Sequence, residues 1–168
     1  MTGLAQLRRV RLSDPEAAPL LAGLREEYRQ RYAGVDVMAD ADVAEFDAPD
    51  GAFVVLVLDG ETVAGAGLRR LDARTAEVKR MWTAPLHRRQ GRARQVLAAL
   101  EDAARQLSYT RIRLETGPAQ PEAVALYLSV GYQQIPVYGR HELAIAFERQ
   151  LPAAVPSGSV RPWRRRHG

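Results

Sequence analysis

The chain has 168 residues, of which 46% are apolar and 26% charged, which suits one ordinary globular domain with its own core. It contains no cysteine, which excludes disulfides, thiolate metal sites and a cysteine nucleophile, and its three histidines are too scattered to predict a metal site. No apolar run approaches the roughly 20 residues of a membrane helix, and the N-terminus lacks the apolar core of a secretion signal. We therefore expect a cytoplasmic protein without a membrane anchor.

The net charge of +4 arises in the C-terminal segment. Residues 151–168 contain four arginines and no acid, whereas residues 1–150 contain 20 basic and 20 acidic side chains. Within this neutral part, residues 26–50 carry eight acids against two arginines, and residues 85–113 carry seven arginines against two acids. The segregation indicates either one end that binds a cation and another that binds an anion, or two solvated faces.

Apolar periodicity and turn residues divide the chain into strands and helices. Asp59-Gly60 between two β-branched runs indicates a hairpin, and Pro121 and Gly131 delimit a short helix. In chain order we expect a strand at 4–12, helices at 15–32 and 39–46, strands at 52–58, 61–71 and 75–83, a helix at 91–107, a strand at 110–115, a helix at 121–130, and strands at 132–135 and 140–148. The order β-α-α-β-β-β-α-β-α-β-β predicts an α/β fold with a mixed sheet in one domain over residues 1–150. Residues 151–168 are expected to form a basic, disordered tail.

A candidate anion site lies in residues 77–93, EVKRMWTAPLHRRQGRA, where a strand leads through a loop to a long helix. The first turn of a helix presents unpaired N–H groups and a positive dipole end. A phosphate that uses these groups must approach the backbone closely, which Gly91 and the small Ala93 permit. Four arginines surround this point: Arg88, Arg89, Arg92 and Arg94. The pattern predicts a pyrophosphate site; the alternative is an ordinary helix with exposed arginines.

Met81–Ala93 resembles the coenzyme A motif of GNAT acetyltransferases. The family pattern [Q/R]-x-x-G-x-[G/A] is met by Arg88, Gly91 and Ala93. Residues 114–132 are similar to the second cofactor segment of the family, with its L-Y-x-x-x-G-[F/Y] pattern met by Leu126, Tyr127, Gly131 and Tyr132. The order of elements agrees over about residues 4–150, so the chain resembles a single GNAT-type acyl-CoA N-acyltransferase domain.

The resemblance implies an N-acetyltransferase that moves an acetyl group from acetyl-CoA to a primary amine by direct attack in a ternary complex. Backbone groups of Met81, Trp82 and Thr83 should pair with the pantetheine arm, and the strand with Met81 should splay from the strand with Leu114. The pyrophosphate should be held by Arg88 and by amides of Arg89, Gln90, Gly91, Arg92, Ala93 and Arg94. Many members carry asparagine where this chain has Gln120, which can also bond to pantetheine or to backbone.

Two side chains are candidates for proton transfer. Tyr127 is placed by the motif near the coenzyme A sulfur as a general acid, although a core tyrosine would show the same helical spacing. Glu77 is the candidate base, on the strand that leads to the cofactor and on the same face as Met81 by strand alternation. The alternative is that Glu77 pairs with an arginine across the sheet. Glu115, Glu26 and Tyr138 are rival bases, or proximity alone suffices.

The acids of residues 26–50 lie where this fold builds its acceptor site, which suggests a cationic amine of a small molecule or peptide; the alternative is a solvated acidic helix. Two other functions stay open. One is an acyl-CoA-binding sensor without catalysis. The other is an anion- or nucleic-acid-binding module that uses the arginine tail with Trp163, although the domain in front of that tail is neutral. A homodimer is possible, but no stretch specifies an interface.

Overall fold

The computed structural model describes residues 3–33 and 43–152. Apolar periodicity, prolines and glycines set the element boundaries much as expected. The elements are β1 (Gln6–Val10), η1 (Pro15–Ala17), α1 (Ala18–Arg31), η2 (Val43–Phe46), β2 (Ala52–Leu58), β3 (Glu61–Arg70), β4 (Thr75–Thr83), η3 (Pro85–His87), α2 (Arg92–Gln106), β5 (Arg111–Thr116), α3 (Pro121–Ser129), β6 (Gln133–Ile135) and β7 (Ile145–Gln150). The η elements are short 3-10 helices.

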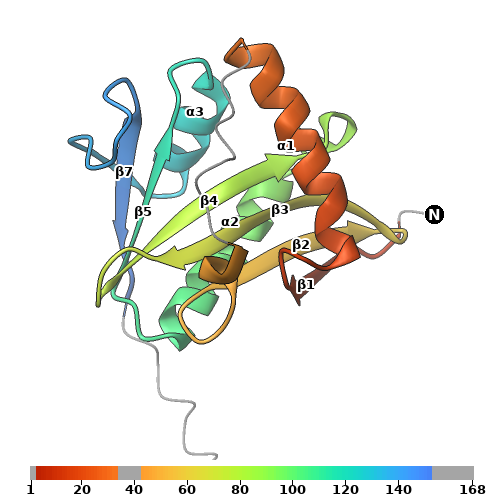
Figure 1. The fold of residues 1–168 in the computed structure, drawn as a ribbon, viewed down its shortest axis with the longest axis horizontal. Helices are drawn as coiled ribbons and strands as arrows, with labels where there is room; N and C mark the ends of the chain where they lie inside the picture. Colours follow the sequence, from red (N-terminus) through yellow and green to blue (C-terminus); the bar gives the residue numbers. More distant parts are fainter. Residues whose placement is uncertain (1–2, 34–42, 153–168) are drawn as a thin grey trace, which may run out of the picture.

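The strands form one seven-stranded sheet in the order β1-β2-β3-β4-β5-β7-β6. Only β4 and β5 run parallel, because α2 connects them as a crossover; the other neighbours are antiparallel. The predicted mixed α/β sheet is therefore confirmed. Figure 1 shows α1 and η2 on one face of the sheet and α2 on the opposite face.

The apolar run of β2 is buried on both faces, which explains why it shows no polar alternation. Val54 and Leu56 pack in the cluster that contains the apolar stripe of α2, and Phe53 and Val55 pack in the cluster that contains α1. The sheet thus separates two cores, named here the α2 face and the α1 face. Helices on both faces leave the sheet edges and the strand ends as the places where a site can open.

The last strand and the second helix differ from the prediction. β7 begins at Ile145, because residues 140–144 are mainly polar and form a loop in which Leu143 is 81% exposed. Of the helix expected at 39–46, the structure shows a 3-10 turn at Val43–Phe46, and residues 39–42 lie outside the described part. Leu151 is buried in the α2-face core, so packing extends at least to this residue. Residues 153–168, with the predicted tail and Trp163, lie outside the described residues.

A buried ion pair connects α2 to β7. Glu101 on α2 accepts hydrogen bonds from Arg149 on β7 at 3.0 and 3.1 Å and from the hydroxyl of Tyr132 at 3.2 Å. Glu101 is 6% exposed, so water does not solvate its carboxylate, and these hydrogen-bond partners stabilise its negative charge instead.

We expect Glu101→Ala to lower the free energy of unfolding by about 2 kcal/mol or more, because it leaves Arg149 and Tyr132 without their acceptor. Chemical denaturation measures the change. Glu101→Gln is the matched control: its carbonyl oxygen still accepts from Tyr132, so it should cost less. An alanine variant as stable as the parent chain would show that this pair contributes nothing to the fold.

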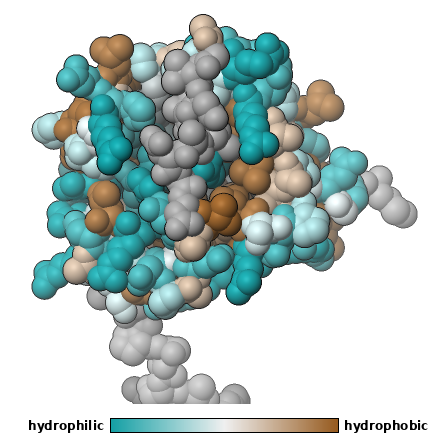
Figure 2. All heavy atoms as spheres, in the orientation of Figure 1, coloured by the Kyte–Doolittle hydropathy of each residue, from teal (hydrophilic) through white to brown (hydrophobic). Residues whose placement is uncertain are grey.

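On the α1 face, shown as spheres in Figure 2, polar residues prevail and apolar ones form small separate groups. The described residues visible on this face therefore form no broad apolar patch, and the homodimer stays a prediction.

Candidate active site

A β-bulge interrupts β4 next to the predicted cofactor motif. The register against β3 shifts by one residue between Gly65 and Gly67, and Arg80 has a φ of +59°. Glu77 lies between two residues of the α2-face core and so points to the α1 face, whereas Met81 packs in the α2-face core. The expectation that Glu77 and Met81 share a face is wrong, because the bulge inserts one extra residue between them.

The parallel strands separate where the motif begins, as expected. β4 pairs with β5 only over Thr75–Glu77 against Arg111–Arg113, while β5 continues beside β7 to Thr116. Figure 1 shows β5 and β7 turning away from β4 beyond this point. From Val78 onward, β4 therefore has an open edge that no strand of the described residues covers.

The backbone of β4 presents polar groups at this open edge. Trp82 is paired with Gly65, and the Ala84 amide donates to the Val63 carbonyl at 2.8 Å in the same register. Because antiparallel residues alternate in direction, the N–H and C=O of Thr83 point away from β3 into the opening. The groups of Trp82 face β3, and the bulge interrupts the ladder at Met81, so the predicted role of its backbone groups stays a prediction. A pantetheine arm would find a backbone partner at Thr83.

The loop before α2 has the shape expected of an anion cradle. Gly91 has a φ of +74°, and a Cβ built on it would meet no atom within 4 Å, so its exposed backbone faces open space. Arg89 is also left-handed, with a φ of +60°. The first turn of α2 begins at Arg92 and holds no acid. Open amides at the positive end of a 15-residue helix fit a pyrophosphate.

The arginines around this cradle are held by protein groups. Arg88 donates to the Thr83 carbonyl oxygen at 3.2 Å, and it lies 3.3 Å from the carboxylate of Glu27 on α1. Arg94 donates to Ser129 at 2.7 Å. These side chains would have to exchange those partners for a phosphate, so their predicted role in binding stays a prediction.

Gln120 supports the loop in front of α3. Its side-chain oxygen accepts from the Gly117 amide, from the Thr116 hydroxyl and from the Tyr32 hydroxyl, at 3.2–3.3 Å. One of the two roles foreseen for it, a bond to backbone, is confirmed. The contact to pantetheine stays a prediction.

Tyr127 is 4% exposed and packs against the rings of Tyr132 and Phe147, with centroids 5.9 and 5.6 Å away. Burial raises the pKa of its phenol well above the usual value, and Tyr28 adds to the rise. Tyr28 belongs to the α1 face, so the two side chains approach from opposite faces of the sheet. Tyr127 is therefore a core tyrosine, as the alternative interpretation expected. Its phenol also stays protonated, as a general acid requires.

Glu77 is buried in an ion pair. Its Oε1 accepts from two nitrogens of Arg69, each at 2.9 Å, and its Oε2 accepts from the hydroxyl of Tyr138 at 2.5 Å. Arg69 lies directly opposite Glu77 on β3. The cross-strand arginine pair considered as an alternative is thus present, and the base role of Glu77 stays a prediction.

The rival bases lie in different surroundings. Glu115 accepts from the Gly139 amide at 2.9 Å, close to Tyr138. Glu26 is exposed and accepts hydrogen bonds from Arg29 and Gln30 on its own helix. No local pattern predicts the contact of Tyr138 with Glu77, since 61 residues separate them and Tyr138 lies in a loop without periodicity.

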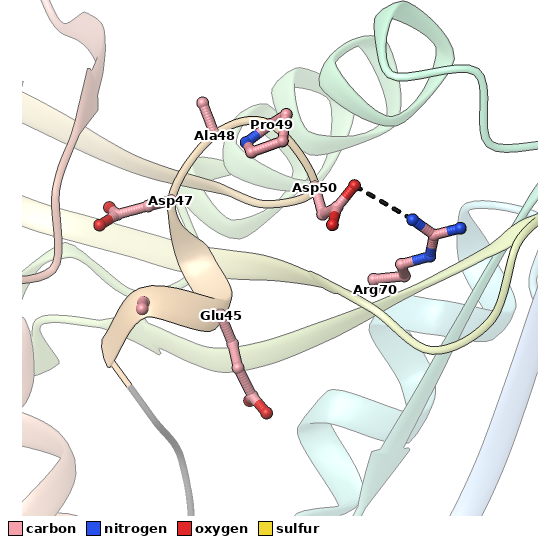
Figure 3. Close-up of a pocket in the computed structure, with 7 residues that line it drawn as sticks. Glu45, Asp47, Ala48, Pro49, Asp50 and Arg70 are labelled. Atoms are coloured by element: carbon pink, nitrogen blue, oxygen red, sulfur yellow. Dashed lines mark hydrogen bonds and ion pairs between the residues drawn. The ribbon is translucent and has the colours of Figure 1, made fainter.

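The described acids of residues 26–50 are largely neutralised by arginines. Glu27 lies 3.3 Å from both Arg31 and Arg88, and Glu45 lies 2.8 Å from Arg69. Figure 3 shows a hollow beside η2 in which Asp50 points to Arg70, at 3.2 Å, while Glu45 points away from that pair. Asp36, Asp40 and Asp42 lie outside the described residues. This hollow holds no residue of the cofactor motif, so we do not assign it to the acetyl donor.

One contiguous part of the chain contains the anion cradle at the start of α2, the bulge in β4 and the point where β4 and β5 separate. Residues 21–132 match the family model described as acetyltransferase (GNAT) family. The chain belongs to the GNAT family. Members of this family are acyltransferases that use acetyl-CoA, so the protein is an acyltransferase enzyme with the GNAT fold.

Relatives and solved structures agree with this assignment. The chain is 33% identical to IAA acetyltransferase of Azospirillum brasilense over 134 residues, which cover 74% of this chain and 87% of that protein. It is 28% identical to the N-acetyltransferase YjgM of Escherichia coli over 137 residues, 77% of this chain and 82% of the other. A Klebsiella pneumoniae structure assigned as an acyl-CoA N-acyltransferase aligns with a TM-score of 0.73 and 26% identity, over 88% of this chain and 98% of that one.

No helix in the described ranges combines the length and the apolar character needed to cross a membrane.

Proposed function

We propose that this GNAT enzyme transfers an acetyl group from acetyl-CoA to a primary amine of a small molecule or peptide, by direct attack in a ternary complex. The observation that carries the proposal is the coincidence of two features. The glycine cradle at the start of α2 directly follows the edge of β4 at Thr83, which no described strand covers because β4 and β5 have separated there, and Arg88 occupies only the carbonyl oxygen of Thr83. The start of α2 fits a pyrophosphate, and the open edge of β4 fits an extended arm that carries amide groups, such as pantetheine.

The residues that would hold the donor follow from this geometry. Amides between Arg89 and Arg94 would bind the pyrophosphate, with Arg88 released from Glu27. Backbone groups of Met81 and Thr83 would bind the pantetheine arm. Acetyl-CoA supplies the activated thioester carbonyl, and the protein supplies position and proton transfer.

Two buried groups would manage the protons. Tyr127 keeps its phenolic proton because burial raises its pKa, and it would donate this proton to the departing sulfur. Glu77, on the opposite face at the point of splay, would take up the proton lost by the amine. Glu77 is paired with Arg69, but Glu115 on the adjoining strand accepts from the Gly139 amide and has no ion pair among the described residues, so its negative charge beside the opening supports a cationic acceptor.

The test is release of free thiol from acetyl-CoA in the presence of a panel of primary amines. The protein contains no cysteine, so a thiol reagent reports only the released coenzyme. Release that requires one amine supports the proposal and identifies the acceptor class. Coenzyme A binding without release for any amine would favour the non-catalytic sensor.

A further inference from the structure

The carboxylate of Glu77 is enclosed by protein donors. Arg69 occupies Oε1 through two nitrogens, and Tyr138 occupies Oε2. The side chain is 3% exposed. An amine approaching through the opening between β4 and β5 therefore has no direct route to either oxygen of Glu77.

Tyr138 covers Glu77 at the place where an amine would arrive. Its hydroxyl reaches Oε2 of Glu77, in the last residue pair that β4 shares with β5, Glu77 and Arg113. The next residue, Gly139, donates to Glu115 farther along β5. The loop between β6 and β7 thus spans the start of the opening, from Glu77 on one strand to Glu115 on the other.

The ring of Tyr138 packs against Arg113 and remains partly accessible to solvent. The guanidinium of Arg113 lies 5.4 Å from its centroid. Tyr138 is half-buried, in contrast to the fully buried Glu77 beneath it. A phenol that donates to a carboxylate still has lone pairs on its oxygen, so Tyr138 can accept a hydrogen bond from an incoming amine.

We propose that Tyr138 is the catalytic residue that contacts the acceptor amine, and that it relays the amine's proton to Glu77. The proposal rests on the proposed acetyl transfer and specifies the proton route in it. Arg69 acts as a positioning residue, since it fixes the carboxylate through Oε1 and leaves Oε2 turned toward Tyr138.

The relay balances without a charged tyrosine. The acceptor arrives as an ammonium ion, and one N–H proton passes to the Tyr138 oxygen while the phenolic proton of Tyr138 passes to Oε2 of Glu77. Glu77 ends protonated, Tyr138 ends neutral, and the nitrogen becomes a nucleophilic amine. As this nitrogen bonds to the carbonyl carbon and the C–S bond breaks, Tyr127 gives its proton to the leaving sulfur and takes up the second N–H proton, so it also ends neutral.

The surroundings keep Tyr138 neutral at rest. Burial raises the pKa of its phenol, and the negative charges of Glu77 and Glu115 raise it further, while Arg113 opposes them. The other charged groups near the pair are Arg69 on β3, Lys79 on β4 at 3.8 Å from Glu77, and Glu45 on η2 behind Arg69. The phenol thus holds its proton until the amine supplies another.

The experiment is the pH dependence of turnover in Tyr138→Phe, which keeps the ring over Arg113 and removes the hydroxyl. A relay lets the enzyme use the ammonium form of the acceptor, so wild-type turnover should be flat near neutrality. Without the relay only the free amine reacts, and it makes up about one part in 1,000 of a lysine-like acceptor at pH 7, so we expect a loss of about 1,000-fold at that pH. This loss should shrink about tenfold per pH unit toward the pKa of the amine, near 10 for a lysine-like acceptor.

Tyr109→Phe is the control, because it also removes a tyrosine hydroxyl that donates a hydrogen bond, to the Asp50 carbonyl oxygen, but lies next to the start of β5, away from the opening. It should keep wild-type turnover. Calorimetry with coenzyme A supplies a readout apart from activity, and Tyr138→Phe should bind with unchanged affinity. If Tyr138→Phe turns over normally, or loses the same factor at every pH, the relay is wrong while the transferase proposal stands. A wild-type enzyme that binds coenzyme A but acetylates no amine contradicts the proposed function instead.

Glu77→Gln tests the residue that receives the proton in the relay. It also keeps the relay testable if the Tyr138 variant folds poorly. The amide can still accept from Tyr138 but takes up no proton, so the same pH-dependent loss is expected. Because the two residues act as one unit, the double variant should be no slower than either single one. Additive losses would contradict a shared proton path.

Discussion

Gly91→Glu is expected to weaken coenzyme A binding by at least about tenfold. Gly91 has a φ of +74°, and its missing Cβ faces open space that the pyrophosphate would occupy. A glutamate there introduces strain, bulk and negative charge into a site that fits an anion. Isothermal titration calorimetry with coenzyme A measures the change.

Gly60→Glu is the control that distinguishes the loss of a phosphate site from the effect of backbone strain. Gly60 has a φ of +83° and also faces open space, but it lies in the β2–β3 turn away from the cradle. It should lose comparable stability and keep its coenzyme A affinity. If Gly91→Glu binds coenzyme A as well as Gly60→Glu does, the start of α2 is not the pyrophosphate site.

Tyr127→Phe is expected to lower turnover by about 100-fold and to change coenzyme A affinity much less. The variant keeps the packing against Tyr132 and Phe147 and removes only the hydroxyl. Burial raises the pKa of this phenol, so the wild-type enzyme should show no alkaline loss from Tyr127 near pH 10, where an ordinary tyrosine ionises. Steady-state kinetics over a range of pH, together with calorimetry, give both quantities.

Tyr109→Phe is the control for this change. Tyr109 is also buried in the α2-face core and donates to the Asp50 carbonyl oxygen at 2.7 Å, next to the start of β5, where β4 and β5 are still paired. It should destabilise the fold by about 1 kcal/mol without slowing turnover. Equal turnover in Tyr127→Phe and Tyr109→Phe would remove Tyr127 from the mechanism.

Local signals in the sequence were sufficient for much of the fold. The bounds of β2 and β4 agree with the prediction to the residue, because a β-branched apolar run and the Asp-Gly turn are short-range signals. Gly91 and Pro121 mark the starts of α2 and α3 through backbone conformation alone. The order of these elements was enough to predict the mixed sheet, whereas the splayed strands were expected from the resemblance to GNAT acetyltransferases.

The side-chain arrangement of the site depends on contacts between distant segments. The bulge at Arg80 reverses the face of every later residue in β4, and no residue type in that strand announces it. Tyr138 reaches Glu77, and Arg88 reaches Glu27, across 61 residues in each case. Such pairs follow from how the loops pack on the sheet, so the sequence could name the candidates but not which of them meet.

The most direct test of the central claim uses acetyl-CoA labelled in its acetyl group, with mass spectrometry of both the amine and the protein. We predict that the label appears on the amine nitrogen of one acceptor, and that the protein carries none when the amine is left out. Label on the protein would contradict direct attack, and an enzyme that binds the donor but labels no amine would contradict acetyl transfer itself.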